Sequence, residues 1–370
     1  MSRKLIICNT HFQVIVAIQL KLTIFKHDDV DIHVSDHSIN ADKVSDNLRK
    51  TGLFHEVNFV KSKKEIASGT VAKVFQFMNV CIGKKRHPAY QDYDEVLFYN
   101  LNMPVYQLMD SAAESSKRTS FSGMEEGVLS YEKMSYGKSP RLVDGIRRFT
   151  RHPQILKELK RYYCFLPQLF DKTTKNYELV QVPSIQSDLE LLRQTLCDVF
   201  EYESHRIEYP YVFFASSSDV DGKGFGETDL VLQLAEVLGK DAILVKMHPR
   251  DNRDIYRSAG IAVMERSDVP WEVCQICGDA DSSICMTVTS GSFLNAAALL
   301  GDRTKGVFLV PSSAANSPYL KTRIAHIANT VTRLHKTGIC RFVCMAQIEE
   351  IEHLFDSLNT TSRIVEGRCE

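Results

Sequence analysis

Two turns that follow apolar stretches carry side chains able to hold a phosphate group. In "AILVKMHPRDN", Lys246 and His248 end an expected strand, and Pro249 fixes the backbone of the turn that presents the imidazole. Both side chains can bind a phosphate, and the imidazole can also donate a proton to it. The alternative is an ordinary histidine between a strand and a loop, and the residues alone do not decide between the two.

The second turn lies in "TVTSGSFLNAAALL", which has the pattern of a strand, a short turn and a helix. The hydroxyl groups of Ser290 and Ser292 and the amides around Gly291 would lie at the helix N-terminus, an arrangement that suits an anion. Plain N-capping by serine is the alternative, and one turn can do both. Ser216 and Ser217 follow another expected strand in "FFASSSDVDGKGFGE". That loop matches neither a dinucleotide fingerprint nor a P-loop, but it could cover a nucleotide.

Two further groups of polar residues occur near the N-terminus. Asn9, Thr10 and Gln13 belong to "CNTHFQ", the first turn between a strand and a helix, and could line a ligand cleft. Thr10 could equally be the N-cap of that helix. In "SGMEEGVLSYEK", Glu125 and Glu126 stand directly before a glycine. Taken alone, this acidic pair is more typical of a solvated turn than of a catalytic site.

The elements that must position these residues alternate between strand and helix. Short apolar runs such as those at 4–8, 30–35 and 95–99 alternate with helical patterns, which predicts a parallel sheet. The alternation breaks near 135–210 and restarts afterwards. We therefore predict an N-terminal Rossmann-like domain over 1–205, a C-terminal one over 206–345, and a C-terminal helix and tail over 346–370. In such folds a ligand usually lies at the carboxyl ends of the strands, here in a central cleft between the domains.

Composition limits the classes of function. The 370 residues include 45 basic and 46 acidic side chains, and this net charge of −1 argues against nucleic acid as a partner. The ten cysteines are scattered, which indicates reduced thiols in the cytoplasm, and we interpret the CxxC at 274–277 as structural. The sequence shows no secretory signal and no run of apolar residues long enough to span a membrane.

A basic and aromatic stretch over about 138–170 is predicted to be a helical insert in the first domain. It contains seven basic residues, namely Lys138, Arg141, Arg147, Arg148, Arg151, Lys157 and Lys160, followed by Arg161 and three aromatic side chains. Such a segment can contact anionic lipid or an anionic acceptor. The alternative, which we favour from the sequence, is a solvated helix face.

The order of these motifs resembles the bacterial sialyltransferases of glycosyltransferase family 52 and, more distantly, the bacterial polysialyltransferases. The similarity rests on "ICNTHFQVIVA", "EEG" at 125–127, "KMHPRD" at 246–251, "VPWEVCQI" at 269–276, "TSGSFLNAA" at 289–297 and "LVPSSAANSPYLKT" at 309–322. Each motif is short, and their joint order carries the resemblance. The basic middle section matches nothing in that family.

The resemblance implies a GT-B fold and an inverting transfer of sialic acid from CMP-sialic acid, without an essential metal or cofactor. The acceptor would be a hydroxyl group, of galactose in the first instance, on a lipooligosaccharide or a lipid-linked capsule repeat unit. Glu125 is preferred as general base and Glu126 is the alternative, with glutamate replacing the aspartate of many relatives. His248 would act as acid on the donor phosphate, which Ser290 and Ser292 would hold.

We expect a cytoplasmic protein. Attachment to the inner face of the cytoplasmic membrane through the basic segment is a further hypothesis, and the resemblance also suggests a homodimer. The first competing interpretation is a glycosyltransferase of the same fold that uses another nucleotide sugar. The second is a non-catalytic protein that binds a nucleotide or a glycan.

Overall fold

The chain folds into two compact α/β units, each with its own sheet. The computed structural model describes residues 2–61, 77–83, 92–115, 118–127, 131, 138–170, 177–183, 185, 189–220, 225–279, 283–300, 305–338, 343–347 and 350–351. The first unit comprises 1–126 and 130–203, and the second comprises 127–129 and 204–370. Each unit is a Rossmann-like α/β domain, as expected from the GT-B fold that the family resemblance implies.

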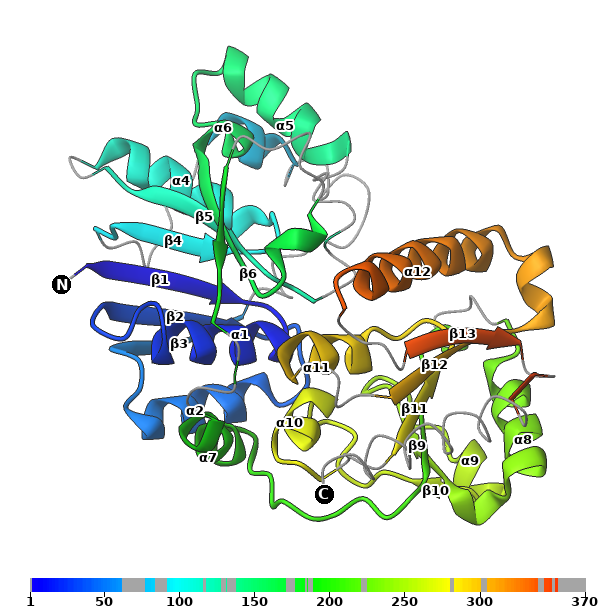
Figure 1. Cartoon of the computed structure of the whole chain (residues 1–370). Helices are drawn as coiled ribbons and strands as arrows, with labels where there is room; N and C mark the ends of the chain where they lie inside the picture. Colours follow the sequence, from blue (N-terminus) through cyan, green and yellow to red (C-terminus); the bar gives the residue numbers. More distant parts are fainter. Residues whose placement is uncertain are drawn as a thin grey trace. The chain divides into compact units, whose positions relative to one another are not determined.

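The first unit contains a seven-stranded parallel sheet (Figure 1). Its strands, in spatial order, are β3 (Glu56–Val60), β2 (Asp29–Ser35), β1 (Arg3–Cys8), β4 (Glu95–Phe98), β5 (Ser120–Met124), β6 (Leu159–Cys164) and β7 (Glu178–Gln181). Its helices are α1 (His11–Leu22), α2 (Ala41–Thr51), α4 (Met103–Glu114), α5 (Lys138–Phe149), α6 (Ile155–Glu158) and α7 (Leu189–Phe200). The strand order reverses between β1 and β4, so a ligand is expected at the carboxyl ends of these two neighbouring strands.

The second unit repeats this topology with a six-stranded parallel sheet. Its strands, in spatial order, are β10 (Ala262–Val263), β9 (Ile243–Lys246), β8 (Tyr211–Phe214), β11 (Ile284–Thr287), β12 (Lys305–Val310) and β13 (Val343–Gln347). Its helices are α8 (Glu227–Leu238), α9 (Ile255–Ser258), α10 (Trp271–Ile276), α11 (Ser292–Leu300) and α12 (Pro318–Lys336). Here the strand order reverses between β8 and β11.

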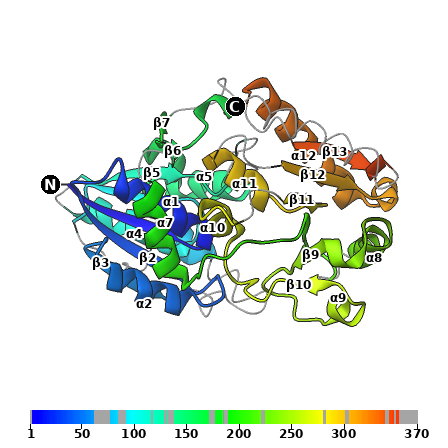
Figure 2. The ribbon, with the colours of Figure 1, turned by 60° about the horizontal axis from the view of Figure 1, so that its bottom comes forward.

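Local sequence explains where several helices begin and end. Thr10 caps α1, since its hydroxyl accepts a hydrogen bond from the amide of Gln13 at 3.3 Å. The α2 helix ends at Gly52, whose φ of 62° is the left-handed conformation of a C-terminal glycine cap. Figure 2 shows α7 beside α1, and it also packs against α2, so the last helix of this unit returns to the first part of the chain.

Aromatic side chains pack helix α11 against the second sheet. Phe293 of α11 packs against Phe308 of β12, with ring centroids 4.9 Å apart, and Phe214 of β8 packs edge-on against Trp271 at 5.0 Å. Gly306 of β12 makes room for this packing, because a Cβ atom there would lie 2.4 Å from the ring of Phe293. The glycine therefore helps to set the position of the α11 N-terminus.

The prediction of a helical insert over about 138–170 is only partly right. α5 and α6 are helices, but 159–164 form β6, an interior strand that pairs with both β5 and β7. The alternating sheet therefore continues through the region where the sequence pattern breaks. Lys160 and Arg161 give this strand its basic character and are exposed, whereas Leu159 and Tyr162 are buried.

The predicted C-terminal helix over 346–370 begins too early, because Ala346 and Gln347 end strand β13. Pairing with β12 across its whole length accounts for this difference. Apart from 350 and 351, the remainder of the predicted helix lies outside the described residues.

We expect Gly306→Ala to lower the free energy of unfolding by about 1–3 kcal/mol, because the added methyl group overlaps Phe293. Chemical denaturation measures this change. Gly145→Ala is the control, since a Cβ atom at that helical position meets nothing within 4 Å. A second substitution, Phe293→Leu, should partly rescue Gly306→Ala, and equal stability of wild type and Gly306→Ala would contradict the packing argument.

Candidate functional site

Both glutamates of the acidic pair follow the end of β5, at the carboxyl edge of the first sheet. Gly123 allows β5 to approach β6 closely, because a Cβ atom there would lie 2.2 Å from the ring of Tyr162. Gly127 has a φ of 131°, which side-chain-bearing residues rarely adopt. Glycines on both sides thus shape the short segment that carries the two carboxyl groups.

Glu125 points into the protein interior and is fully buried. Its Oε2 accepts hydrogen bonds from the hydroxyl of Tyr131 and from the amide of Phe165, the latter at 2.8 Å. Its Oε1 is also buried and has no hydrogen-bond partner in the described part of the chain. Burial raises the pKa of Glu125 to about 7, against the effect of the two hydrogen bonds. The geometry is that of an anchor for the segment that follows β6.

Glu126 has the setting of an acid-base group. It is partly exposed, and its carboxyl group accepts a hydrogen bond from Thr10, so it lies beside the N-terminus of α1. Burial raises the pKa of Glu126 to about 8. Its Oε2 has no hydrogen-bond partner among the described residues. The geometry therefore favours Glu126 over Glu125, which is the reverse of the preference drawn from the sequence.

Asn9 and Gln13 hold the turn between β1 and α1. The amide of Asn9 donates to Oε1 of Gln13 at 2.6 Å, and the hydroxyl of Ser35 donates to Oδ1 of Asn9 at 2.8 Å. The Nε2 of Gln13 is buried, with no partner in the part of the chain described by the structure. The cavity beside this turn, which Asn9, Ser35 and Asn102 help to line, has a volume of only about 10 Å³. That is room for a water molecule at most.

His248 follows β9 at the carboxyl edge of the second sheet and is partly exposed. Its Nδ1 accepts a hydrogen bond from the amide of Arg250 at 3.2 Å. This contact places the proton of the neutral imidazole on Nε2. The exposed Pro249 provides the turn that brings the amide of Arg250 back to the ring.

Lys246 is not placed to hold a ligand in this structure. Its side chain is buried, and Nζ donates to the carbonyl groups of Ser267 and Val269 at 2.7 and 2.8 Å. Burial lowers its pKa. Lys246 therefore links the end of β9 to the segment before α10, and its predicted part in donor binding has no geometric support.

Ser216 and Ser217 follow β8, the strand next to β9, and both are partly exposed. The amide and hydroxyl of Ser216 donate to Oε2 of Glu227 at 2.7 and 2.9 Å. Glu227 begins α8 and is buried, which raises its pKa to about 7, and its Oε1 has no partner among the described residues. The hydroxyl of Ser217 accepts from Arg250 at 2.8 Å, so the loops after β8 and β9 are joined.

Ser290 and Ser292 surround the N-terminus of α11, as the sequence predicts. Their hydroxyl groups are 3.1 Å apart, and the amide of Ser290 donates to the hydroxyl of Thr287 at 3.0 Å. Gly291 lies between them and starts α11, since its carbonyl accepts from the amide of Asn295 at 3.0 Å. Arg323 of α12 donates to the carbonyl of Thr289 at 3.3 Å. The turn therefore combines hydroxyl groups, a helix N-terminus and a guanidinium group.

The topology brings these loops to one place in the second unit. β9, β8 and β11 are neighbouring parallel strands, so the turns that carry His248, Ser216 and Ser290 all lie at the same sheet edge. The order of the strands reverses between β8 and β11, which is the usual position of a bound nucleotide in such sheets. Within this unit, the structure therefore forms a polar site suited to a phosphate group.

Sequence reasoning missed two residues of this site. Arg323 lies far along the chain, in a helix whose pattern contains no anion-binding motif, and only the fold brings it to the turn at 289. Glu227 follows the glycine-rich loop and reads as an ordinary acidic residue in the first turn of a helix. Its burial against Ser216 depends on the packing of α8 and could not be inferred from spacing.

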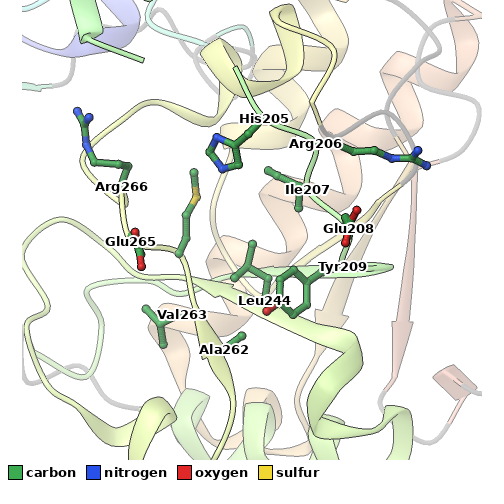
Figure 3. Close-up of a pocket in the computed structure, with 11 residues that line it drawn as sticks. His205, Arg206, Ile207, Glu208, Tyr209, Leu244, Ala262, Val263, Glu265 and Arg266 are labelled. Atoms are coloured by element: carbon green, nitrogen blue, oxygen red, sulfur yellow. The ribbon is translucent and has the colours of Figure 1, made fainter. Parts of the chain in front are cut away.

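A larger cavity of about 390 Å³ lies elsewhere in the second unit (Figure 3). It is lined by the segment before β8, by Leu244 of β9, and by the residues of β10 and just after it. Arg206 and Arg266 occur there together with Glu208 and Glu265, so the charges are balanced. None of the predicted site residues lines this cavity, which is distinct from the polar site after β8, β9 and β11.

The described residues contain no group of three or more His, Cys, Asp or Glu side chains arranged to hold a metal ion. Within the same residues, no helix combines the length and the apolar character that are needed to cross a membrane.

Comparisons with known proteins assign no activity to this chain. No protein-family model matches the sequence, and no curated protein matches it. Among solved structures, the calicheamicin glycosyltransferase CalG4 is similar over 97% of this chain and 90% of its own, with a TM-score of 0.49 and 12% identity. A sialyltransferase from Photobacterium damsela is similar over 93% and 81%, with a TM-score of 0.46 and 13% identity.

A third similar structure is named as an epimerase and not as a transferase. The putative UDP-N-acetylglucosamine 2-epimerase from Listeria monocytogenes is similar over 90% of this chain and 89% of its own, with a TM-score of 0.46 and 10% identity. With TM-scores below 0.5, these likenesses assign neither a donor nor a reaction. The resemblance to family 52 therefore stays a prediction.

We expect the protein to lose stability as the pH rises from about 5 to 8. Glu126, with a pKa raised from 4.5 to about 8, keeps its proton when the unfolded chain has lost it. Unfolding in this range releases that proton, so the free energy of unfolding falls by about 1.4 kcal/mol per pH unit for this group. Urea denaturation at several pH values measures the slope.

Glu126→Gln should make the slope shallower, because glutamine does not titrate. Glu190→Gln is the control, since the Glu190 side chain is 85% exposed. An unchanged slope in Glu126→Gln would show that burial does not raise the pKa of this carboxyl group.

Proposed function

We propose that the protein is an inverting sialyltransferase, which moves sialic acid from CMP-sialic acid to a hydroxyl group of a bacterial surface glycan. The observation that carries the proposal is the polar site at the carboxyl edge of β9, β8 and β11. An imidazole and two serine hydroxyl groups occur there on turns at the same sheet edge, and the guanidinium of Arg323 reaches the turn at 289 from α12. The chemistry of these groups suits the phosphate of a nucleotide sugar.

Departure of the nucleotide is the first chemical demand of this reaction. The bond between the anomeric carbon and the phosphate oxygen breaks, and negative charge grows on the phosphate. His248, with its proton on Nε2, can donate a hydrogen bond to that oxygen, and Ser290 and Ser292 can donate further hydrogen bonds that stabilise the charge. In this proposal Arg323 supplies the positive charge that a metal would otherwise provide, and no cofactor takes part.

Activation of the acceptor is the second demand. The acceptor oxygen forms its bond to the anomeric carbon as its proton passes to a carboxylate. Each glutamate has one buried oxygen without a partner in the described part of the chain, but the residue Glu126 is partly exposed whereas Glu125 is fully buried. A pKa of about 8 makes the deprotonated form of Glu126 a good proton acceptor near neutral pH. A single displacement would invert the donor configuration.

Galactose on a lipooligosaccharide or a lipid-linked capsule repeat unit is the acceptor that the sequence resemblance favours. A glycosyltransferase with another nucleotide sugar is the second candidate, because the same phosphate site would serve any nucleotide sugar. The contacts of the described residues do not select a sugar.

We expect CMP-sialic acid to release CMP in the presence of the protein, and UDP- and CDP-sugars to release much less nucleotide. His248→Ala should lower the rate about 100-fold, because the leaving phosphate loses a hydrogen-bond donor that stabilises its charge. His205→Ala is the control, an exposed histidine in the other cavity. No CMP release with or without acceptors would contradict the donor assignment, and turnover of another sugar would support the second candidate.

We expect Glu126→Gln to lower transfer about 100-fold or more while leaving donor affinity unchanged. The wild-type rate should rise with pH through about 8, as the carboxyl group of Glu126 loses its proton. Glu125→Gln should retain most of the rate and chiefly change stability. The opposite result, with activity lost only in Glu125→Gln, would assign the base to Glu125.

A further inference from the structure

Helix α5 presents an unusual outer face in the first unit, next to α6 (Figure 1). Phe149 is 88% exposed and Leu142 is 58% exposed, although both are large and apolar. They are seven residues apart, so they lie on one stripe of the helix, about 10 Å apart along its axis. The small residue Gly145 lies between them and is exposed.

The inner face of α5 explains why these side chains must point outward. Val143 is buried, and the fully buried Arg147 pairs with Asp110 of α4. The same guanidinium donates to the carbonyl of Pro153 at 2.7 Å. Asp144 is also buried, and its carboxylate accepts from the amides of Ile155 and Leu156 at 3.1 and 2.9 Å. These contacts fix the rotation of the helix about its axis.

Exposed basic side chains occur in α5 and in the segment that follows it. Five of them are exposed, namely Arg141, Arg148, Arg151, Lys157 and Lys160. In the described part of the chain, neither Arg141 nor Arg148 forms an ion pair, because the only acidic residue of α5 faces inward. Glu158 is the one acidic residue between 141 and 160 that is not buried. The local charge is therefore strongly positive on a chain whose net charge is −1.

We propose that this face of α5 docks the protein on an anionic membrane surface, with Leu142 and Phe149 inserted among the lipid headgroups. A convex helix with isolated protruding apolar side chains and a basic rim fits the interface of a bilayer. A protein partner would instead need a contiguous apolar patch. This inference does not rest on the sugar donor, although a membrane surface would bring the protein to a lipid-linked acceptor.

Vesicle sedimentation tests the proposal with the whole protein. Wild type should sediment with vesicles of phosphatidylcholine and phosphatidylglycerol but not with phosphatidylcholine alone, and salt should weaken the binding. Phe149→Ser should weaken it about tenfold, since one large apolar side chain no longer leaves water. Arg148→Ser should weaken it about fivefold at low salt.

The α7 helix offers matched controls. Leu191 is 57% exposed, close to the 58% of Leu142, so Leu142→Ser and Leu191→Ser remove equally exposed leucines. Arg193→Ser is the control for Arg148→Ser. The leucines, Phe149 and Arg148 are exposed, and Arg193 is partly exposed in a surface pair with Glu190, so the thermal midpoint and the release of CMP in the absence of vesicles should change little.

Three results would overturn the proposal. The first is no binding of wild type to anionic vesicles. The second is equal binding by Leu142→Ser and Leu191→Ser. The third is a change in self-association, seen by analytical ultracentrifugation in the α5 variants without an effect on vesicle binding, because this would identify the face as a contact between copies of the chain.

Discussion

All strands of a parallel sheet end at the same edge, and the candidate site depends on this constraint. In the first sheet it brings Thr10 and Glu126 into contact, although they are far apart in sequence. In the second sheet it brings the turns after β9, β8 and β11 to one edge, with Arg323 added by α12. Neither set of residues could be assembled from local structure alone.

A carboxylate with a structural role lies at the amino ends of the strands of the first sheet. Glu95 begins β4, is buried, and contacts Nζ of Lys4 at 3.0 Å and the hydroxyl of Ser122 at 2.5 Å. Both of its oxygens have partners. Glu125, Glu126 and Glu227, at the carboxyl edges, each keep a buried oxygen without a partner in the described residues, and burial raises the pKa of all three. An unpaired oxygen therefore distinguishes these acids from Glu95, and the exposure of the residue distinguishes Glu126 from Glu125.

The basic segment shows how composition can mislead about structure. Its charge predicted a solvated helical insert, but the insert includes an interior strand and the fully buried Arg147. The burial of Arg147 and Asp144 turns Leu142 and Phe149 toward solvent. The same inward contacts that stabilise α5 thus create the apolar and basic face that we assign to a membrane.

The sequence by itself determined the fold class, most element positions and the turns that carry His248 and Ser290, because hydrophobic periodicity and turn chemistry are local properties. It put Glu125 and Glu126 directly before a glycine, but strand β5, which ends just before them, came only from the structure. Only the tertiary structure decided which glutamate is fully buried, since Tyr131 and the segment after β6 supply the hydrogen bonds to Glu125. It likewise decided that Lys246 binds carbonyl groups and that Arg323 contacts the turn before α11, because these contacts join residues distant in the chain.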